Sequence, residues 1–382
     1  MQTHFNTKTK LCTSVTSFSP FFLLTLPSPA AAHDADSVCT RRIHWHADAV
    51  SEGQWNMTDG RAGWANLLSA GLDVDTWRGG CAEIGALATG HLGHAVADDL
   101  QDFSNINAEN RAFRLIHLGL RQEWDKKIKG FVYFGLRQAD EDYFNTDCAA
   151  LFTGASYGCV PQAGDNFAIG VYPEAALGIH AEIAPSDRWL IRQSIYNGTA
   201  SDRLSRQFRF CPKSDGFAAM GSVTFSPDWL PRRKGTDGES DCAFQPAYVL
   251  GYIAGQQADE ETGRLIGGGS VWASIDQPLL RLRRTTLALF ATGGTRIGRL
   301  NAARGHWAAG LLLDGLTRRG GTLGIGVSRA IYADGHETDL EITSSLPLCQ
   351  WAQLQPALHV VRTCGETALI GALRLCICLE GK

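Results

Sequence analysis

The feature that most constrains the fold is a strict alternation of apolar and polar residues along the C-terminal third of the chain. In one segment Leu340 and Ile342 fall on one face, while Glu341 and Thr343 fall on the other. Successive side chains of a β-strand point to opposite faces, so this pattern predicts strands with one apolar and one wet face. The C-terminal segments run for about 9 to 11 residues, the length at which a tilted strand crosses a bilayer, whereas globular strands are commonly about 5 or 6 residues long.

The same alternation recurs along the chain, separated by residues that favour tight turns. The apolar faces are Val132, Phe134 and Leu136; Trp189, Ile191 and Ile195; Val271, Ala273 and Ile275; Leu323, Ile325 and Val327; and Leu369, Leu373, Leu375, Ile377 and Leu379. The turn signals include Pro185-Ser186-Asp187, Asn197-Gly198, Pro227-Asp228, Gly293-Gly294 and Asp334-Gly335. Together they predict a meander of antiparallel hairpins.

The first residues have the layout of a secretory signal. Lys8 and Lys10 precede the apolar stretch 18–26, and the small residues 30–32 follow it, so we expect cleavage near His33. Beyond that residue the chain has no apolar run of the roughly 18 residues that a membrane helix needs. It is therefore expected to be exported, and either soluble or membrane-spanning as strands.

Composition favours strands. The chain has 42 glycines in 382 residues, more than the usual glycine share of about 7%. Its charged fraction is 19%, below the usual value of about 25%. The formal net charge of -4 implies no basic field for nucleic acid. A sheet in lipid must close on itself to satisfy its backbone groups. We therefore predict an all-β transmembrane antiparallel barrel.

The predicted domains are a signal peptide at 1–32, an N-terminal segment at 33–80 and the barrel at 81–382. Within the N-terminal segment, the run 66–71 resembles a short helix ended by Gly71. We interpret this segment as a helical plug or a periplasmic element that precedes the barrel.

The chain resembles the carbohydrate-selective porins of the OprB type from about Met57 to Leu379. The resemblance rests on the order and spacing of Leu151-Phe152 with Tyr157-Gly158, Tyr172-Pro173 with Leu177-Gly178, Asp187-Arg188-Trp189 with Tyr196-Asn197-Gly198, and the terminal stretches 354–361 and 368–375. It implies a porin-like barrel of about 16 strands in a Gram-negative outer membrane. It also implies passive diffusion of mono- or disaccharides into the periplasm, contact with outer-membrane lipid, insertion by the barrel assembly machinery and, by analogy with porins, a homotrimer. The chain lacks the aromatic last residue that such barrels typically carry.

Passage of sugars needs no catalysis, because a narrow lumen lined by planar hydrogen-bonding groups and aromatic faces replaces the water around hydroxyls. The pore-lining candidates are Arg137, Asp140, Asp142, Trp272, Asp276 and Arg374. Arg137 shares an inward parity with Phe131 and Tyr133, and Arg374 lies opposite the apolar face of the last strand. The competing interpretation is that these are ordinary polar residues of a porin interior without a selective role.

No catalytic residue, metal or cofactor is expected. The stretch 154–158 matches the Gly-x-Ser-x-Gly elbow, but no helix is predicted after it, as the elbow would require. His44 and His46 are interpreted as tail residues, because two donors do not define a metal site. Cys148 with Cys159, or Cys211 with Cys242, are alternatives for loop disulfides.

Two other functions stay open at the level of sequence. A general diffusion porin for ions and small solutes shares the barrel, and differs in that sugars do not block its ion current. A secreted soluble β-sandwich would bind carbohydrate, or hydrolyse it with paired carboxylates such as Asp339 and Glu341 on one strand face. Such a sandwich would leave a membrane pellet without detergent.

Overall fold

The alternating segments form sixteen antiparallel strands that close into a single barrel in a computed structural model of the chain. The structure describes residues 43–94, 96, 103–227, 244–259, 262–282, 285–300, 302–317, 320–363 and 365–381. Each strand pairs with its neighbours in sequence, and β1 (Ile43–Asn56) pairs with β16 (Thr367–Gly381) to close the ring. Closure leaves no strand edge facing lipid, as a sheet in a bilayer requires.

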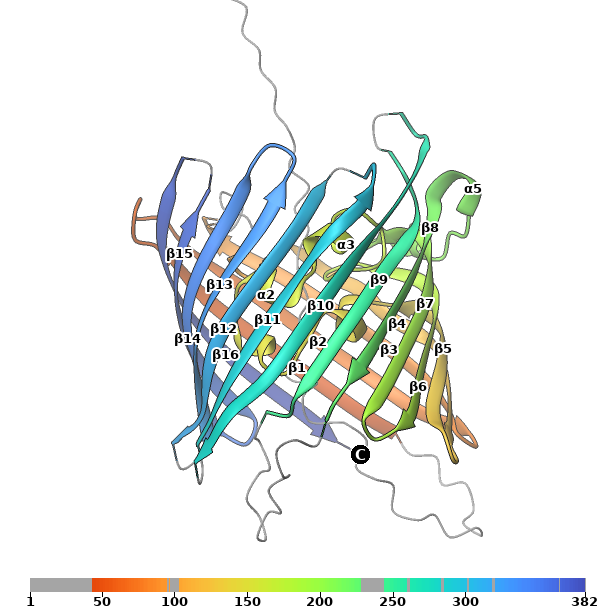
Figure 1. Cartoon of the computed structure of the whole chain (residues 1–382), viewed down its shortest axis with the longest axis horizontal. Helices are drawn as coiled ribbons and strands as arrows, with labels where there is room; N and C mark the ends of the chain where they lie inside the picture. The colour runs from red at the N-terminus through yellow and green to blue at the C-terminus, as the bar shows by residue number, and fades with distance from the viewer. Residues whose placement is uncertain are drawn as a thin grey trace, which may run out of the picture.

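The remaining strands follow in chain order around the barrel (Figure 1). They are β2 (Ala62–Trp77), β3 (Gly80–Gly93), β4 (Arg111–Asp125), β5 (Lys129–Arg137), β6 (Ala175–Ser186), β7 (Trp189–Ser201), β8 (Gly216–Phe225), β9 (Ala247–Ala258), β10 (Leu265–Leu282), β11 (Thr285–Gly298), β12 (Ala303–Thr317), β13 (Gly320–Tyr332), β14 (His336–Cys349) and β15 (Ala352–Arg362).

The short helices are α1 (Asp140–Tyr143), η3 (Ala149–Leu151), α2 (Ala155–Gly158), α3 (Pro161–Gly164), α4 (Leu204–Gln207) and α5 (Pro212–Asp215). In the described part of the chain, none of the helices is long and apolar enough to cross a bilayer.

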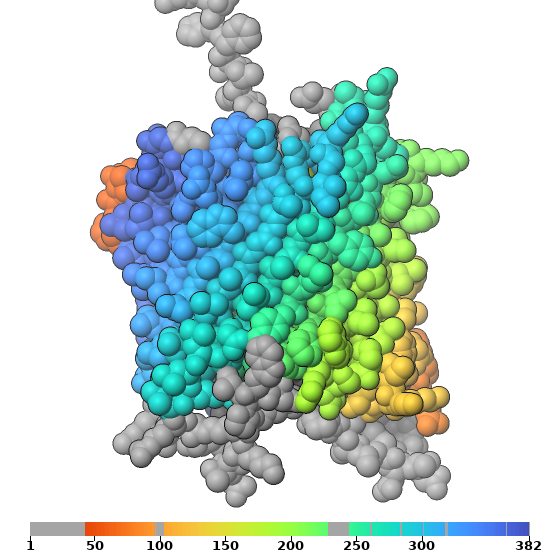
Figure 2. All heavy atoms as spheres, in the orientation of Figure 1, coloured from red at the N-terminus to blue at the C-terminus, as the bar shows by residue number. Residues whose placement is uncertain are grey.

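The period of two sorts side chains between an outer and an inner face of the barrel. Leu340 and Ile342 are exposed on the outside, whereas Glu341, between them, is fully buried inside. Figure 2 shows the outer wall as a continuous surface across neighbouring strands. Exposed tryptophans lie at or near strand ends, as in the aromatic girdles of membrane barrels: Trp45, Trp55, Trp64, Trp77, Trp189, Trp307 and Trp351.

The two ends of the barrel differ in the length of their connections. Gly381 and Ile43 lie at the same end, marked C in Figure 1, because the number of strands is even. Most connections at this end span two or three residues, such as 78–79, 126–128 and 187–188. Longer connections join strands at the opposite end. In outer-membrane barrels the short turns face the periplasm, so we name this end the periplasmic end.

The longest described connection, residues 138–174 between β5 and β6, folds back into the barrel. It carries α1, η3, α2 and α3, and Figure 1 shows α2 and α3 behind the front strands. Its apolar residues build one buried cluster with β6 to β10, and another with β11 and β12. We call this segment the lumen loop. It fills with side chains an interior that sixteen strands alone would leave as a wide channel.

The helix expected at 66–71 is wrong, because these residues belong to β2. Leu67 is buried inside the barrel and Leu68 is exposed outside it. Two adjacent leucines resembled a helical run, yet they occupy opposite faces of a strand. The predicted start of the barrel domain at residue 81 is therefore too late in the chain, since β1 and β2 are part of the barrel wall. The expected signal at 1–32 lies outside the described residues.

Two turn predictions also fail. Asn197-Gly198 lies within β7, and Gly293-Gly294 lies within β11. A Cβ on Gly294 would lie 2.1 Å from Nε2 of Gln162 in the lumen loop, so this glycine makes room for the loop and does not turn the chain. The closed barrel also rules out the two-sheet sandwich considered above.

Candidate functional site: the lumen loop and the charged wall

The lumen loop is fixed first to β10. Asp276 accepts hydrogen bonds from Thr146 Oγ1 at 2.8 Å and from the backbone N–H of Cys148 at 2.9 Å. Trp272 lies on the same face of β10. Its ring meets the ring of Phe144 edge-on, with the two centroids 5.3 Å apart. Asp276 and Trp272 are each about 1% exposed. Both side chains lie inside the barrel, where they contact the loop and do not border open water.

A second anchor lies across the barrel on β14 and β15. Glu341 accepts three hydrogen bonds, from Thr153 N at 2.8 Å, Thr153 Oγ1 at 2.9 Å and Gly154 N at 2.9 Å. His359 lies 3.0 Å from Thr153 Oγ1 through Nε2 and 3.0 Å from Asp339 through Nδ1. Asp339 and Glu341 do share one strand face, as predicted, yet their oxygens bind the loop and the histidine. This contact set is called the β14 anchor.

Glycines on β12 and β13 give the loop the room to approach the wall. A Cβ on Gly326 would lie 2.7 Å from Cε1 of Phe152 and 2.8 Å from Cε1 of Tyr157. A Cβ on Gly310 would lie 3.0 Å from Cζ of Phe152. Phe152 and Tyr157 stack on each other with centroids 4.5 Å apart. The inner face of these strands is therefore shaped to receive two aromatic rings.

At its start the loop is tied to the strand it leaves. Arg137 donates through Nε and Nη2 to both oxygens of Asp142, each at 2.6 Å. Although burial alone would raise the pKa of Asp142, the charge and hydrogen bonds of Arg137 lower it overall. Asp140 accepts a hydrogen bond from Tyr172 N at 3.0 Å, and burial, reinforced by the charge of Glu141, raises its pKa to about 7. The three residues predicted here thus lie together.

Charged side chains on the inner faces of β3 to β7 remain partly open to water. Arg121 is paired with Glu83 at 2.8 Å and Arg192 with Glu182 at 2.7 Å. Their side chains keep between 10% and 30% exposure, in contrast to the buried anchors on the opposite wall. We define the charged wall as Glu83, His117, Arg121, Arg137, Glu182 and Arg192.

The charged wall continues onto the lumen loop. His117 Nε2 lies 2.9 Å from Glu141 of α1, and His180 lies 3.6 Å from Asp142. Arg137 connects the two parts, because its Nη1 also lies 3.9 Å from Glu83. The start of the loop is therefore joined to the charged wall, while Arg121, Glu182 and Arg192 of the wall keep partial exposure.

Arg374 is the predicted residue that stands apart. It faces inward on β16 as expected, but it is 1% exposed and donates through Nε to Glu52 of β1 at 2.7 Å. Glu52 also accepts a hydrogen bond from Ser104 Oγ at 2.7 Å. The pair joins the first and last strands inside the barrel, at the seam where the ring closes.

Sequence reasoning missed most of the charged wall and the whole β14 anchor as such. The parity that placed Arg137 inside also applied to His117 and Arg121, whose neighbours Leu118 and Leu120 are exposed outside. That signal was available. The partners of Glu341 could not be found from a local pattern, because Thr153 is 188 residues away in sequence.

The features that resembled an enzyme or a disulfide have other places in the fold. Residues 155–158 form α2 and α3 follows at Pro161, so the expectation of no helix there is wrong. Ser156 nevertheless lies in a short helix of the lumen loop, and not on a strand-to-helix turn. No disulfide joins Cys148 to Cys159 in the described residues; Cys242 lies outside them. His44 and His46 belong to β1 and not to a tail.

A closed sixteen-stranded barrel with an apolar outer belt, an inward-folded loop and a charged lumen defines an outer-membrane porin. The model of the carbohydrate-selective porin OprB family matches residues 84–361. The chain belongs to that family.

Solved structures share the fold at low identity. The high-pH structure of Pseudomonas putida OprB has a TM-score of 0.69 at 14% identity, over 89% of this chain and 94% of that one. The low-pH structure of the same protein gives 0.58 at 15%, over 88% and 92%. Outer-membrane expressed OmpT of Vibrio cholerae gives 0.54 at 8%, over 90% and 99%. The comparison with curated proteins found no match.

The family and the fold together assign the molecule to the outer membrane as a multi-pass β-barrel and as a carbohydrate porin. The predicted family, the predicted antiparallel barrel and the predicted function are confirmed. The roles of individual lumen residues stay predictions.

Proposed function

We propose that mono- and disaccharides diffuse passively between the lumen loop and the charged wall, and that the wall supplies the groups to which their hydroxyls bind in transit. Arg121, Arg137 and Arg192 present planar donors, and Glu83 and Glu182 present acceptors. Asp140, Asp142, Trp272, Asp276 and Arg374 act by fixing the loop and the seam, and not by touching solute.

The observation that carries this proposal is the pairing within the wall. Each arginine lies within 4 Å of a carboxylate, so opposite charges largely cancel while their remaining donors and acceptors stay available. Sugars are neutral and rich in hydroxyls, and they exchange hydrogen bonds with such groups at little cost in charge desolvation. Weak binding to several groups also permits exit from the channel.

Single-channel recording in planar bilayers tests the proposal. Glucose or maltose is expected to reduce the ion current through the wild-type channel, because the sugar occupies the passage next to the wall. Arg192→Ala should weaken the block by about tenfold, the effect of losing roughly one charged hydrogen bond. Arg329→Ala is the matched control, since Arg329 lies on β13 at a position of outward parity.

Current that sugars do not reduce in the wild type would overturn the sugar-binding role and favour the general diffusion porin. Equal loss of block in Arg192→Ala and Arg329→Ala would show that the wall is not where sugars bind. Heat-modifiable migration on a gel confirms that each variant is a folded barrel before recording.

We also propose that residues 1–32 are a cleaved signal, that the barrel assembly machinery inserts the chain, that it forms a homotrimer, and that it has no enzymatic activity. The carboxylates Asp339 and Glu341 support the last point, because they are engaged with His359 and the loop. The trimer rests on analogy with other porins. Cross-linking of the detergent-extracted protein tests it, and a purely monomeric product would refute it.

A further inference from the structure

Two groups of metal-ligating side chains occur among the described residues, and only one has donors left for a ligand. Asp339, Glu341 and His359 form the first group, but they are the β14 anchor and their donor atoms hold the lumen loop. Asp73, Cys81 and Glu83 form the second. It lies on the inner face of β2 and β3, beside the turn at 78–79, and so at the periplasmic end of the barrel.

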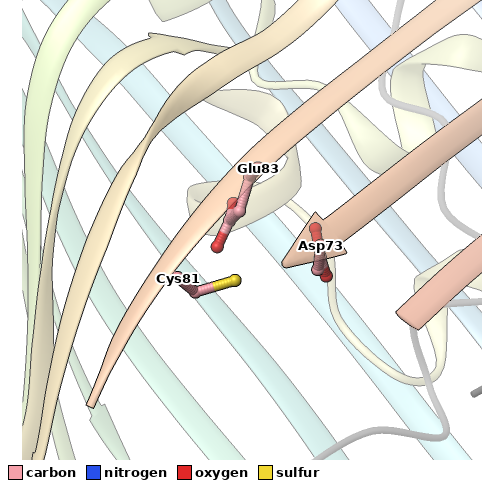
Figure 3. A group of neighbouring side chains, drawn as sticks. All are labelled: Asp73, Cys81 and Glu83. Carbon is pink, nitrogen blue, oxygen red and sulfur yellow. The ribbon is translucent and has the colours of Figure 1, made fainter. Parts of the chain in front are cut away.

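The second group is assembled by strand register. Asp73 lies directly opposite Glu83 across β2 and β3, and Asp75 lies opposite Cys81. One donor atom of each of Asp73, Cys81 and Glu83 lies within 4.8 Å of the others. Figure 3 shows the Cys81 thiol directed toward Asp73, with the Glu83 carboxylate extending toward Cys81 from the same strand. Three donors from two rigid strands therefore converge.

The donors have little exposure and few directed hydrogen bonds. Cys81 is 7% exposed and Glu83 is 9% exposed. Glu83 Oε1 is buried and accepts no hydrogen bond, and its partner is the Arg121 guanidinium, whose Nε lies 2.8 Å away in an ion pair. The Cys81 thiol makes one long contact, 3.7 Å to the carbonyl oxygen of Ala82. Arg121 compensates the charge of Glu83, and a cation between the three donors would add the directed bonds that the thiol and this carboxylate lack.

We propose that Asp73, Cys81 and Glu83 bind a divalent cation of the zinc class on the periplasmic side of the lumen. One thiolate and two carboxylates suit a borderline ion that accepts sulfur and oxygen ligands, and they suit calcium or magnesium poorly. With bonds of about 2.0 to 2.3 Å, tetrahedral ligands are about 3.3 to 3.8 Å apart. Side-chain rotation of about 1 Å therefore completes the site.

His44 is the candidate for a fourth ligand. The register of β1 and β2 places it directly opposite Asp73, and residues directly opposite on one face have neighbouring side chains. The principal opposing group is Arg121, whose guanidinium lies beside Glu83. It retains a second partner, Glu123 at 3.2 Å, when the ion takes Glu83.

Zinc titration of the detergent-purified, full-length barrel tests the proposal, with a chromogenic chelator as competitor. Cys81→Ser and Asp73→Asn should each weaken zinc binding by at least about tenfold. Even the loss of a group that only supports a metal ligand typically lowers metal affinity by about that factor. Arg121→Gln should tighten it, because a competing positive charge is removed. Cys349→Ser and Cys378→Ser are matched controls at the same end of the barrel and should bind as the wild type does.

A second readout does not depend on affinity. Zinc should slow maleimide labelling of Cys81, followed by mass spectrometry, and leave labelling of the exposed Cys211 unchanged. Unchanged zinc affinity in Cys81→Ser, or a loss that appears equally in the two cysteine controls, overturns the proposal. So does labelling of Cys81 that zinc does not slow. Heat-modifiable migration again separates a lost site from a misfolded barrel.

Discussion

Single carboxylates decide whether the lumen loop stays in place. Glu341 holds three donors of Thr153 and Gly154 with one side chain, and Asp140, at the start of the loop, ties it to Tyr172 near the end of the loop. Both are buried, so each contact is strong and each is costly to break.

Glu341→Ala is expected to release the loop from β14. The backbone N–H groups of Thr153 and Gly154 would lose their acceptor, and His359 would lose a neighbouring charge. Breaking a buried contact set of this kind costs about 3 kcal/mol. Single-channel conductance should rise and the thermal midpoint of the heat-modifiable form should fall. Glu366→Gln, on an exposed turn residue, is the control; a conductance equal to that of the wild type in Glu341→Ala would contradict the role of the anchor.

The buried carboxyl of Asp140 predicts a pH dependence. Its pKa of about 7 in the folded state exceeds the unfolded value of about 3.9, so the folded protein binds more protons between these values. Stability from this group is therefore greatest at low pH and is lost as pH rises toward and through about 7.

Asp140→Asn should remove this dependence. We expect the variant to gain stability relative to the wild type at pH 8 and not at pH 4, measured as the midpoint of thermal unfolding in detergent. Asp187→Asn, in an exposed turn, should follow the wild type. A difference between Asp140→Asn and wild type that does not vary with pH would refute the assignment.

At the scale of elements, the strands were largely predictable and the loop was not. Period-two alternation fixed which face of β10, β14 and β16 points inward, because side-chain direction in a strand is a local property. Helix 66–71 failed because Leu67 and Leu68 break the visible alternation. The position of the loop depends on contacts such as Thr153 with Glu341, which no local pattern contains.

The glycines facing the loop make an element-scale prediction. Gly326→Ala should push Phe152 and Tyr157 off β13, since the added Cβ would lie 2.7 Å from the ring of Phe152. Overpacking of this kind costs about 1 to 3 kcal/mol, and a displaced loop should weaken the sugar block. Gly90→Ala is the control, because nothing lies within 4 Å of its added Cβ. Block of equal strength in both variants would argue against a wall shaped by glycine.

At the scale of the whole molecule, function depends on closure of the ring. Ala49 pairs with Ile377 of β16 and with Leu68 of β2. Ala49→Pro removes a backbone donor from this ladder, so we expect loss of the heat-modifiable form and of channel activity. Ala49→Thr keeps the donor and suits a strand, so it should retain both. A heat-modifiable, conducting barrel in the Ala49→Pro variant would contradict the need for backbone pairing between β1 and β16.

The β14 anchor also constrains the order in which the molecule can be built. The lumen loop is synthesised well before β14 and β15, yet its tip has no acceptor until those strands exist. Contacts between distant parts of a chain form late and slowly. Seating of the Thr153–Gly154 part of the loop thus becomes a late step that reports completion of the last strands of the wall, whereas the contacts with β10 can form earlier.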